Sequence, residues 1–111
     1  MVLVVTGDGI STHSGTICGS DVLGTVTVGS NDFVFIDNSL MMVIDGTMEV
    51  PDHNNPPCVP PNILSHSFTA DITQQSFVTI GDVPVSLVGD NYSTDQTDIT
   101  GAGQTFVEVE L

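Results

Sequence analysis

The shortness of its apolar segments is the feature that most limits what this chain can fold into. Apolar residues occur in brief runs or alternate with polar ones, and Gly, Asp, Asn, Ser or Pro interrupts them every several residues. No stretch shows the three- and four-residue spacing of an amphipathic helix, so the pattern predicts short strands joined by turns. We therefore expect an all-β protein and, at 111 residues, a single domain over 1–111.

The predicted strands are bounded by turn residues. Two residue pairs, Asp37-Asn38 and Gly81-Asp82, favour tight hairpin turns. The segment 50–61 holds five of the six prolines, and because proline lacks a backbone donor we expect a stiff, extended loop there. The predicted strands are 3–6, 16–18, 25–28, 33–37, 40–45, 67–73, 77–80, 85–88 and 106–111.

A weak repeat relates three parts of the chain. Residues 32–46 align with 76–90, so that Phe33 falls on Phe77, and a partial third copy surrounds Phe106. A fainter echo relates 4–15 to 86–97. Because a single hairpin cannot bury its apolar face alone, we expect the copies to pack around a shared axis. We expect the three phenylalanines at equivalent positions, packed in the shared core in preference to an interface.

The charge of the chain excludes several classes of partner. It contains fourteen acidic residues, no Lys and no Arg, which gives a formal net charge of −14. Nucleic-acid binding takes most of its affinity from Lys and Arg on phosphates, so we expect no nucleic-acid partner. Nothing basic could attach the chain to an anionic membrane surface or anchor an anionic substrate. We therefore expect no small-molecule substrate and no enzyme activity.

The N-terminal segment predicts synthesis in the cytoplasm without a signal peptide. The run "MVLVV" is too short for the apolar core of a signal peptide, and no basic residue precedes it. The longest uninterrupted apolar run, 40–44, has the length of a strand and not of a membrane span.

Four residues could together hold a metal ion. The chain's histidines are His13, His53 and His66, and the last two bracket Cys58. Three imidazoles and one thiolate form a tetrahedral donor set for structural zinc. They would join the turn after the first strand, the proline-rich loop and the segment after it, and the ion would be a fixed positive charge in an acidic chain. Histidines that are simply solvated remain the alternative, with Cys18 as a substitute ligand or a buried thiol.

The overall pattern resembles the PAAR-repeat family of spike-tip proteins. The stretch "VVTGDGISTHSG" carries the Gly-Asp pair, and then the His with a Gly close behind, that mark the family. The stretch "FVTIGDVPVSLVGD" follows the family's repeated hairpin motif closely. The earlier copy, "FVFIDNSLMMVIDG", is degenerate, and the Pro-Ala-Ala-Arg string of the family is missing.

The resemblance implies a small conical pseudo-threefold stack of β-hairpins with a metal-stapled apex. It implies one structural zinc per chain, in preference to iron, on His13, His53, Cys58 and His66. Proteins of this family cap the trimeric β-helical spike of contractile phage tails and type VI secretion systems, and they help to pierce the target cell envelope. The chain would then lie at the tip of a virion tail baseplate, or be secreted at the tip of a contractile injection machine.

Two other functions compete with this interpretation. A small acidic β-sandwich that binds glycans or calcium would leave the histidines incidental, and the acidity of the chain is its best support. One Tyr, no Trp and no calcium-loop spacing argue against that module. A metalloenzyme ranks third, because it would need a ligand position left open to water.

Overall fold

The computed structural model describes residues 1–14, 21–53 and 64–111. Over these residues the chain is all-β, as predicted, with short strands and one 3₁₀ turn. Within this described part, no helix is long and apolar enough to cross a membrane. The elements are β1 (Val2–Leu3), β2 (Ile10–His13), β3 (Val22–Thr25), β4 (Phe35–Ile36), β5 (Ser39–Leu40), β6 (Met48–Val50), β7 (His66–Phe68), β8 (Thr79–Ile80), β9 (Val83–Pro84), β10 (Asn91–Tyr92), η1 (Ser93–Asp95), β11 (Thr97–Gly101) and β12 (Glu108–Val109).

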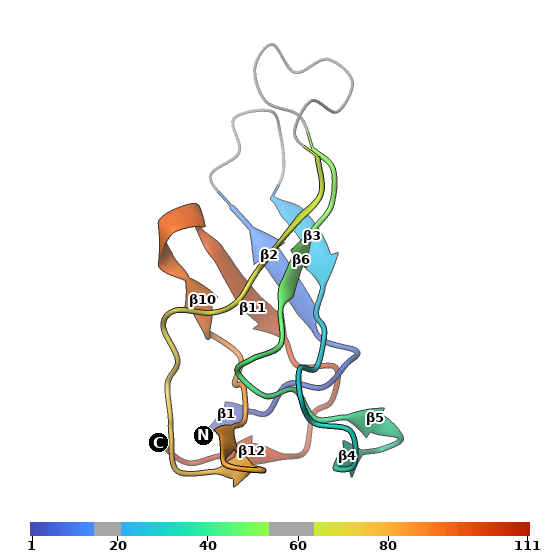
Figure 1. Ribbon diagram of the computed structural model, residues 1–111, viewed down its shortest axis with the longest axis vertical. Helices are drawn as coiled ribbons and strands as arrows, with labels where there is room; N and C mark the ends of the chain where they lie inside the picture. Colours follow the sequence, from blue (N-terminus) through green and yellow to red (C-terminus); the bar gives the residue numbers. More distant parts are fainter. Residues whose placement is uncertain (15–20, 54–63) are drawn as a thin grey trace.

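Four strands form a central antiparallel sheet in the order β10-β11-β2-β3 (Figure 1). β2 lies between β11 and β3, and its last residue, His13, pairs with Thr97 on one side and Val22 on the other. β6 and β7 form a separate antiparallel pair in which Val50 faces His66. Gly24 lets β3 approach this pair closely, because a Cβ there would collide with the carbonyl oxygen of Glu49.

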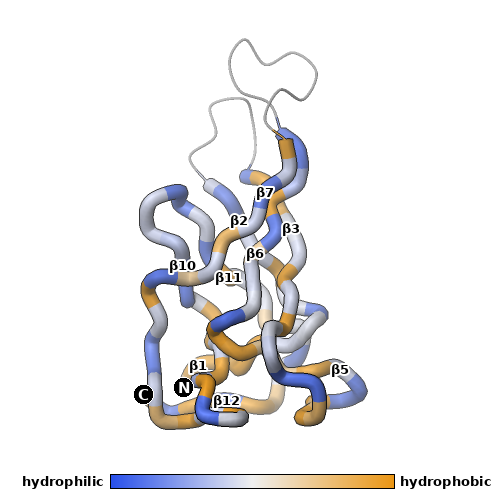
Figure 2. The backbone as a smooth tube through the Cα atoms, in the orientation of Figure 1, coloured by the Kyte–Doolittle hydropathy of each residue, from blue (hydrophilic) through white to orange (hydrophobic). Residues whose placement is uncertain are grey.

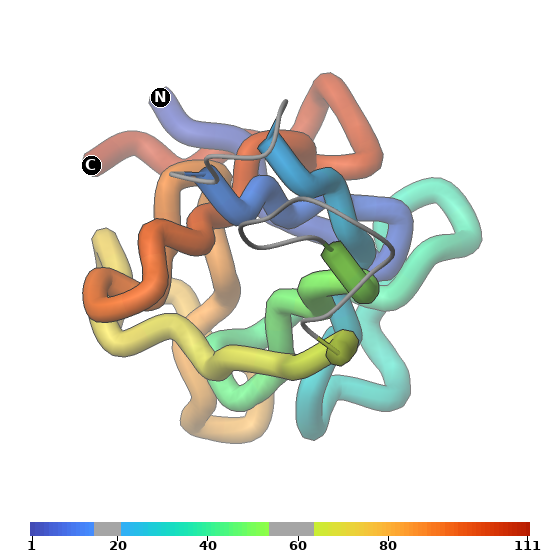
Figure 3. Tube along the Cα trace, turned by 90° about the horizontal axis from the view of Figure 1, so that it is seen from above, coloured from blue at the N-terminus to red at the C-terminus, as the bar shows by residue number. Residues whose placement is uncertain are grey.

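Three two-stranded pairs, β4–β5, β8–β9 and β1–β12, share one register. The corresponding partners are Phe35 with Leu40, Thr79 with Pro84, and Glu108 with Leu3. The first two pairs are closed by the predicted turns 37–38 and 81–82, whose four residues have φ between 50° and 69°. Positive φ at both central positions is the conformation of the turn that suits a two-residue hairpin. In the third pair the N- and C-termini of the chain lie where the other two pairs have their turn. Figures 1 and 3 both show the termini side by side.

A closed ring of backbone hydrogen bonds joins the three pairs. Val5 N donates to Ser86 O at 3.0 Å, Ser86 N donates to Met42 O at 2.9 Å, and Met42 N donates to Val5 O at 2.8 Å. A second threefold set of bonds runs in the opposite direction around the ring: Gly7 N to Leu40 O, Ile44 N to Pro84 O and Val88 N to Leu3 O. Each pair therefore contacts both of the others through its backbone.

The ring also fixes how the repeated segments correspond. Met42 and Ser86 are 44 residues apart (86 − 42), the offset that the sequence repeat predicted. Val5 and Ser86 are 81 apart (86 − 5), one residue less than the fainter echo implied. That echo was therefore wrong by one residue at the ring.

The apolar core consists of two clusters. One joins the three pairs through six buried residues, Val4, Ile36, Val43, Val85, Leu87 and Val109. The other lies under the central sheet and comprises Val5, Val26, Met42, Met48 and Ile99. Figure 2 shows hydrophobic positions concentrated toward the end of the molecule that carries β1 and β12. Each fully buried Val, Ile, Leu or Met side chain contributes about 1.5–3 kcal/mol, so short strands of this kind are held mainly by the two clusters.

Several strand predictions differ from the structure. The predictions missed β2, β6, β10 and β11, and they placed β3 and β9 a few residues too late in the chain. β2 and β11 are rich in Ser and Thr, and they bury some of these polar residues: Ser11 is 1% exposed and donates its hydroxyl to Glu49 O at 3.0 Å. Hydroxyls that find partners inside the fold can replace the apolar alternation on which the prediction relied. The predicted strand 16–18 lies outside the described residues.

The preferred placement of the phenylalanines in the core is wrong. Phe33, Phe77 and Phe106 are 65%, 65% and 63% exposed. The inward position two residues before each of them is taken by a side-chain amide, that of Asn31, Gln75 or Gln104. The core between the three pairs is already filled by Val, Ile and Leu, so the aromatic rings point to solvent.

Candidate metal centre and exposed aromatic face

The three histidine rings lie together at one site. The ring centroids of His13 and His53 are 5.2 Å apart, those of His53 and His66 are 5.6 Å apart, and those of His13 and His66 are 6.2 Å apart. They come from the end of β2, the segment just after β6 and the start of β7. His13 was expected in a turn and is instead the last residue of a strand, which fixes its backbone between β11 and β3.

Hydrogen bonds set the same tautomer in all three rings. The Nδ1 atoms of His53 and His66 each lie 2.9 Å from a backbone carbonyl oxygen, that of Pro51 and of Leu64. A carbonyl only accepts, so each Nδ1 carries the hydrogen and, in the neutral ring, Nε2 keeps a free lone pair. This is the arrangement in which metal-binding histidines are usually held.

The ring of His13 is held in the same way by a hydroxyl. Its Nδ1 lies 3.0 Å from Thr97 Oγ1. That hydroxyl donates its own hydrogen to Asp95 O at 3.1 Å, so it accepts from the imidazole. The Nε2 atom of His13 is thereby left with a free lone pair as well.

Imidazole groups are suitable ligands for a metal ion, but the three rings lie slightly farther apart than one tetrahedral ion requires. With zinc–nitrogen bonds of 2.0–2.1 Å, three imidazoles on one tetrahedral ion would have ring centroids about 5.2 Å apart. The His13–His53 separation of 5.2 Å meets this value, and the His13–His66 separation of 6.2 Å exceeds it. Within 1–14, 21–53 and 64–111, no group of three or more His, Cys, Asp or Glu could hold a metal ion as the side chains stand. Cys58 and Cys18 lie outside these residues.

One carboxylate faces two of the histidines and was not among the predicted site residues. Asp95 Oδ2 lies 3.7 Å from His13 Nδ1 and 3.6 Å from His66 Nε2. Asp95 is the last residue of η1, and the left-handed backbone of Gln96 (φ 51°) follows it and turns the chain into β11. The fainter echo contains a signal for this residue, because it aligns Ser11-Thr12-His13 with Ser93-Thr94-Asp95.

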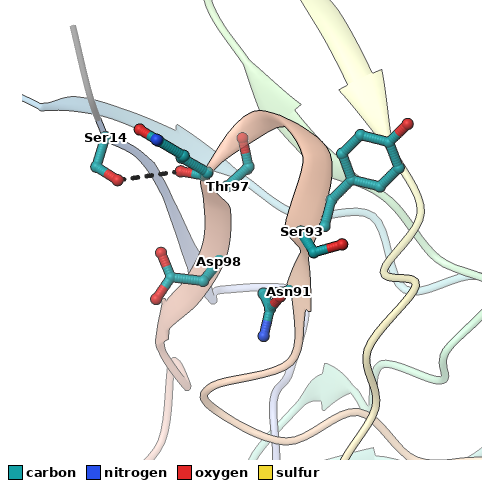
Figure 4. A pocket seen from close by; sticks show the side chains of 7 residues that line it. Ser14, Asn91, Ser93, Thr97 and Asp98 are labelled. Atoms are coloured by element: carbon teal, nitrogen blue, oxygen red, sulfur yellow. Dashed lines mark hydrogen bonds between the residues drawn. The ribbon is translucent and has the colours of Figure 1, made fainter.

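Two shallow cavities lie beside this site. The larger, of ≈ 310 Å³, is polar, and Figure 4 shows Asn91, Ser93, Thr97 and Asp98 around it, with the Ser14 hydroxyl donating to Gln96 O at 3.2 Å. The smaller, of ≈ 210 Å³, borders His13 and Asp95. The Tyr92 ring beside the larger cavity stacks on Phe68, with centroids 4.5 Å apart and planes at 9°.

The β10–η1 connection is tied to the segment after β7 by a carboxylate. Asp71 accepts hydrogen bonds from the backbone N–H and the hydroxyl of Ser93, both at 2.9 Å. These two donors hold the pKa of Asp71 below its usual value. The connection that presents Asp95 is thus positioned from outside the central sheet.

The three exposed phenylalanines are held by one repeated pattern, which we call the amide bracket. In each copy the amide nitrogen of Asn31, Gln75 or Gln104 donates to two backbone carbonyls, and the amide oxygen accepts from two backbone N–H groups. The twelve donor–acceptor distances lie between 2.7 Å and 3.2 Å. The segments read "NDFV", "QSFV" and "QTFV", so the chain carries the bracket as a short motif of Asn or Gln two residues before Phe-Val.

Comparison with known proteins adds no relative. No family model, no curated protein and no solved structure matches this chain. The function must therefore be inferred from the residues themselves.

Proposed function

We propose that this protein is the tip of a contractile-injection spike, which caps a trimeric β-helical spike and helps it to pierce a cell envelope. The observation that carries the proposal is the threefold recurrence of one amide bracket, each presenting one exposed phenylalanine. Three equivalent contact points on one chain suit a partner that has three equivalent chains. On this proposal the role is mechanical, and the site is the tip of a virion tail baseplate or of a secretion machine.

The ring of backbone bonds supports a pseudo-threefold stack of hairpins as the body of the tip. Val5, Met42 and Ser86 occupy equivalent places in it, and the register of the three strand pairs is the same. A conical body would place this ring at the broad end and the histidines at the narrow end. The molecule measures 44 × 25 × 23 Å, so one axis is long enough to separate two such ends.

The convergence of the histidines supports a structural metal at the narrow end. On this proposal one zinc ion, in preference to iron, is held by His13, His53, His66 and Cys58. The bound ion would supply cross-linking and positive charge in a chain of net charge −14. The chain's own contribution is orientation, because the acceptors Pro51 O, Leu64 O and Thr97 Oγ1 each fix one imidazole.

The aromatic face supports docking on the end of a trimeric spike. Exposed aromatic anchors commonly dominate the binding energy of an interface when they enter pockets of the partner. Exposed carboxylates flank two of them, Asp32 beside Phe33 and Glu108 near Phe106. A chain without Lys or Arg would therefore be matched by a spike end with apolar pockets and a basic or neutral rim.

A glycan-binding module is the second candidate, and the polar cavity of ≈ 310 Å³ is the observation in its favour. Sugar sites commonly use the open face of an aromatic ring as a platform. The Tyr92 ring beside this cavity is already stacked on Phe68. The stacking covers one face of that ring, the cavity is lined mainly by hydrogen-bonding groups, and the spike-tip proposal explains more of the molecule.

Binding to a trimeric β-helical spike encoded in the same genome tests the proposal. A variant carrying Phe33→Ser, Phe77→Ser and Phe106→Ser should lose more than about 100-fold in affinity, because each anchor contributes on the order of 2 kcal/mol. The matched control is Leu23→Ser, since Leu23 is 64% exposed but lies on β3 in the central sheet. Equal affinities of the triple variant and the wild type would show that the three phenylalanines do not contact the spike. A wild-type protein that binds no such spike would overturn the function itself.

A further inference from the structure

We propose that the end of the trimeric spike presents one arginine from each of its three chains, and that each guanidinium lies against one of three equivalent positions on this protein, Phe35, Thr79 and Glu108. The inference rests on the proposed function, because it names the chemistry of the spike end that the aromatic face would meet. We call each strand pair together with its amide bracket an arm: arm 1 contains β4–β5, arm 2 contains β8–β9 and arm 3 contains β1–β12.

The shared register of the arms makes the three positions equivalent. Each lies two residues after a bracketed phenylalanine, and the residues opposite them in the strand pairs are Leu40, Pro84 and Leu3. The following residues of the same strands, Ile36, Ile80 and Val109, belong to the core that joins the arms or pack against it. Because successive side chains of a strand point to opposite sides, the three positions face away from that core. All three are exposed, Phe35 by 56%.

One side chain of the partner has to suit three different side chains of this protein. A spike of three identical chains offers the same residue to every arm. That residue must pack on an aromatic ring at Phe35, bond a hydroxyl at Thr79 and meet a carboxylate at Glu108. An acidic residue would repel Glu108, and an aliphatic residue would leave its charge unmatched. Arginine suits all three, because its planar guanidinium stacks on aromatic rings and carries five N–H donors for hydroxyl and carboxylate oxygens.

A carboxylate at the outer end of every arm supports the same choice. Asp37 on arm 1 and Glu110 on arm 3 occupy corresponding places, directly after Ile36 and Val109, and Asp82 lies in the turn of arm 2. All three carboxylates are exposed. No Lys or Arg of this protein can neutralise them, because the chain contains neither. A guanidinium on each spike chain would supply the missing charge, and its bonds to carboxylates are strong because both groups are charged.

The three arms then contribute to binding in different ways. Arm 1 offers the face of Phe35 for stacking, and arm 3 offers the Glu108 carboxylate for a charged pair. Arm 2 has only the Thr79 hydroxyl at this position, so a carboxylate introduced there would add a charged pair that arm 2 lacks. Position 79 is therefore the place at which a change of charge reports most clearly on the residue that the spike presents.

Opposite charges placed at Thr79 test the inference, with the trimeric spike encoded in the same genome as the binding partner. Thr79→Glu copies arm 3 on arm 2 and should raise the affinity, whereas Thr79→Arg brings two guanidinium groups together and should lower it. We expect the dissociation constants of the two variants to differ by more than about tenfold. Thr94→Glu and Thr94→Arg are the controls and should bind alike, since Thr94 is exposed and lies in η1, outside the arms. Equal affinities of the two Thr79 variants, or weaker binding by Thr79→Glu, would overturn the inference.

A second measurement identifies the spike residue without any variant. Because this protein contains no arginine, arginine-selective modification with phenylglyoxal acts on the arginines of the spike alone. Mass spectrometry should find one arginine position in each spike chain that the bound wild-type protein protects. A spike that binds the protein with no protected arginine would contradict the inference and leave the proposed function standing. A wild-type protein that binds no such spike would instead overturn the proposed function.

Discussion

The two ends of this molecule are held by different kinds of interaction. The hairpin end repeats one backbone pattern three times, and the ring through Val5, Met42 and Ser86 closes on itself. Among the described residues of the histidine end no such repetition occurs, and His13, His53 and His66 come from three unlike segments whose imidazole rings lie together. Backbone bonds and apolar packing can stabilise the first end unaided, whereas on our proposal the second end is held together by a metal ion.

Metal removal should have the largest effect, and it should destabilise the histidine end much more than the hairpin end. Structural zinc contributes about 10–16 kcal/mol in zinc-finger peptides, and we expect a smaller loss of several kcal/mol here because the hairpin end keeps its core. Hydrogen exchange after chelation should show lost protection in β6 and β7. The amides of Val5, Met42 and Ser86 should stay protected. Loss of protection over the whole chain at once would show that the ends are not independent.

The amide bracket should matter to stability and the phenylalanine that it presents should not. Gln75→Ala leaves Val78 and Val85 carbonyls and two backbone N–H groups without their partner, so we expect a loss of about 2 kcal/mol. Phe77→Ala removes a side chain that is 65% exposed and should cost less than about 0.5 kcal/mol. Urea unfolding of the two variants measures the difference. Equal losses would contradict the division between support and contact surface.

A smaller effect is expected at the first hairpin turn. Asn38 has φ 69°, which glycine adopts at lower cost, and Asp-Gly is a favoured pair for this turn. Asn38→Gly should therefore raise stability by about 0.5 kcal/mol, and Asn38→Ala should lower it by about 1 kcal/mol. Thermal unfolding midpoints report both changes. A loss of stability in Asn38→Gly together with a gain in Asn38→Ala would contradict a positive φ at position 38.

The smallest expected effect is the pH response of the connection that carries Asp95. The pKa of Asp71 is lowered in the folded state by the two donors of Ser93, relative to about 3.9 in the unfolded chain. Its contribution is therefore complete above the unfolded pKa and is lost as pH falls through the folded pKa. Asp71→Asn should remove this part of the acid sensitivity, measured as unfolding midpoints between neutral pH and about pH 2. An unchanged profile would show that the Ser93 bonds are not maintained in solution.

The sequence predicted the parts of this fold that depend on local rules. The pairs Asp37-Asn38 and Gly81-Asp82 need positive φ, and both form the expected turns. The missed strands β2 and β11 bury hydroxyls such as that of Ser11, whose acceptor Glu49 lies far away in the chain. Such partners cannot be read from a local pattern of apolar residues.

The candidate site shows the same limit. The three histidines could be selected because they are the chain's complete set of imidazoles. Asp95 is one of fourteen acidic residues, and it reaches the site through the long-range pairing of Thr97 with His13, which no local pattern predicts. The phenylalanines were found as equivalent positions, but their exposure follows from amide brackets that need long-range carbonyls such as Val4 O for Gln104.

The stoichiometry of a complex with the spike tests the central claim most directly. A body with three equivalent faces in one chain should cap a trimer with a single copy, so native mass spectrometry should find one copy of this protein for three spike chains. Three copies for each trimer, or no complex at all, would contradict the account.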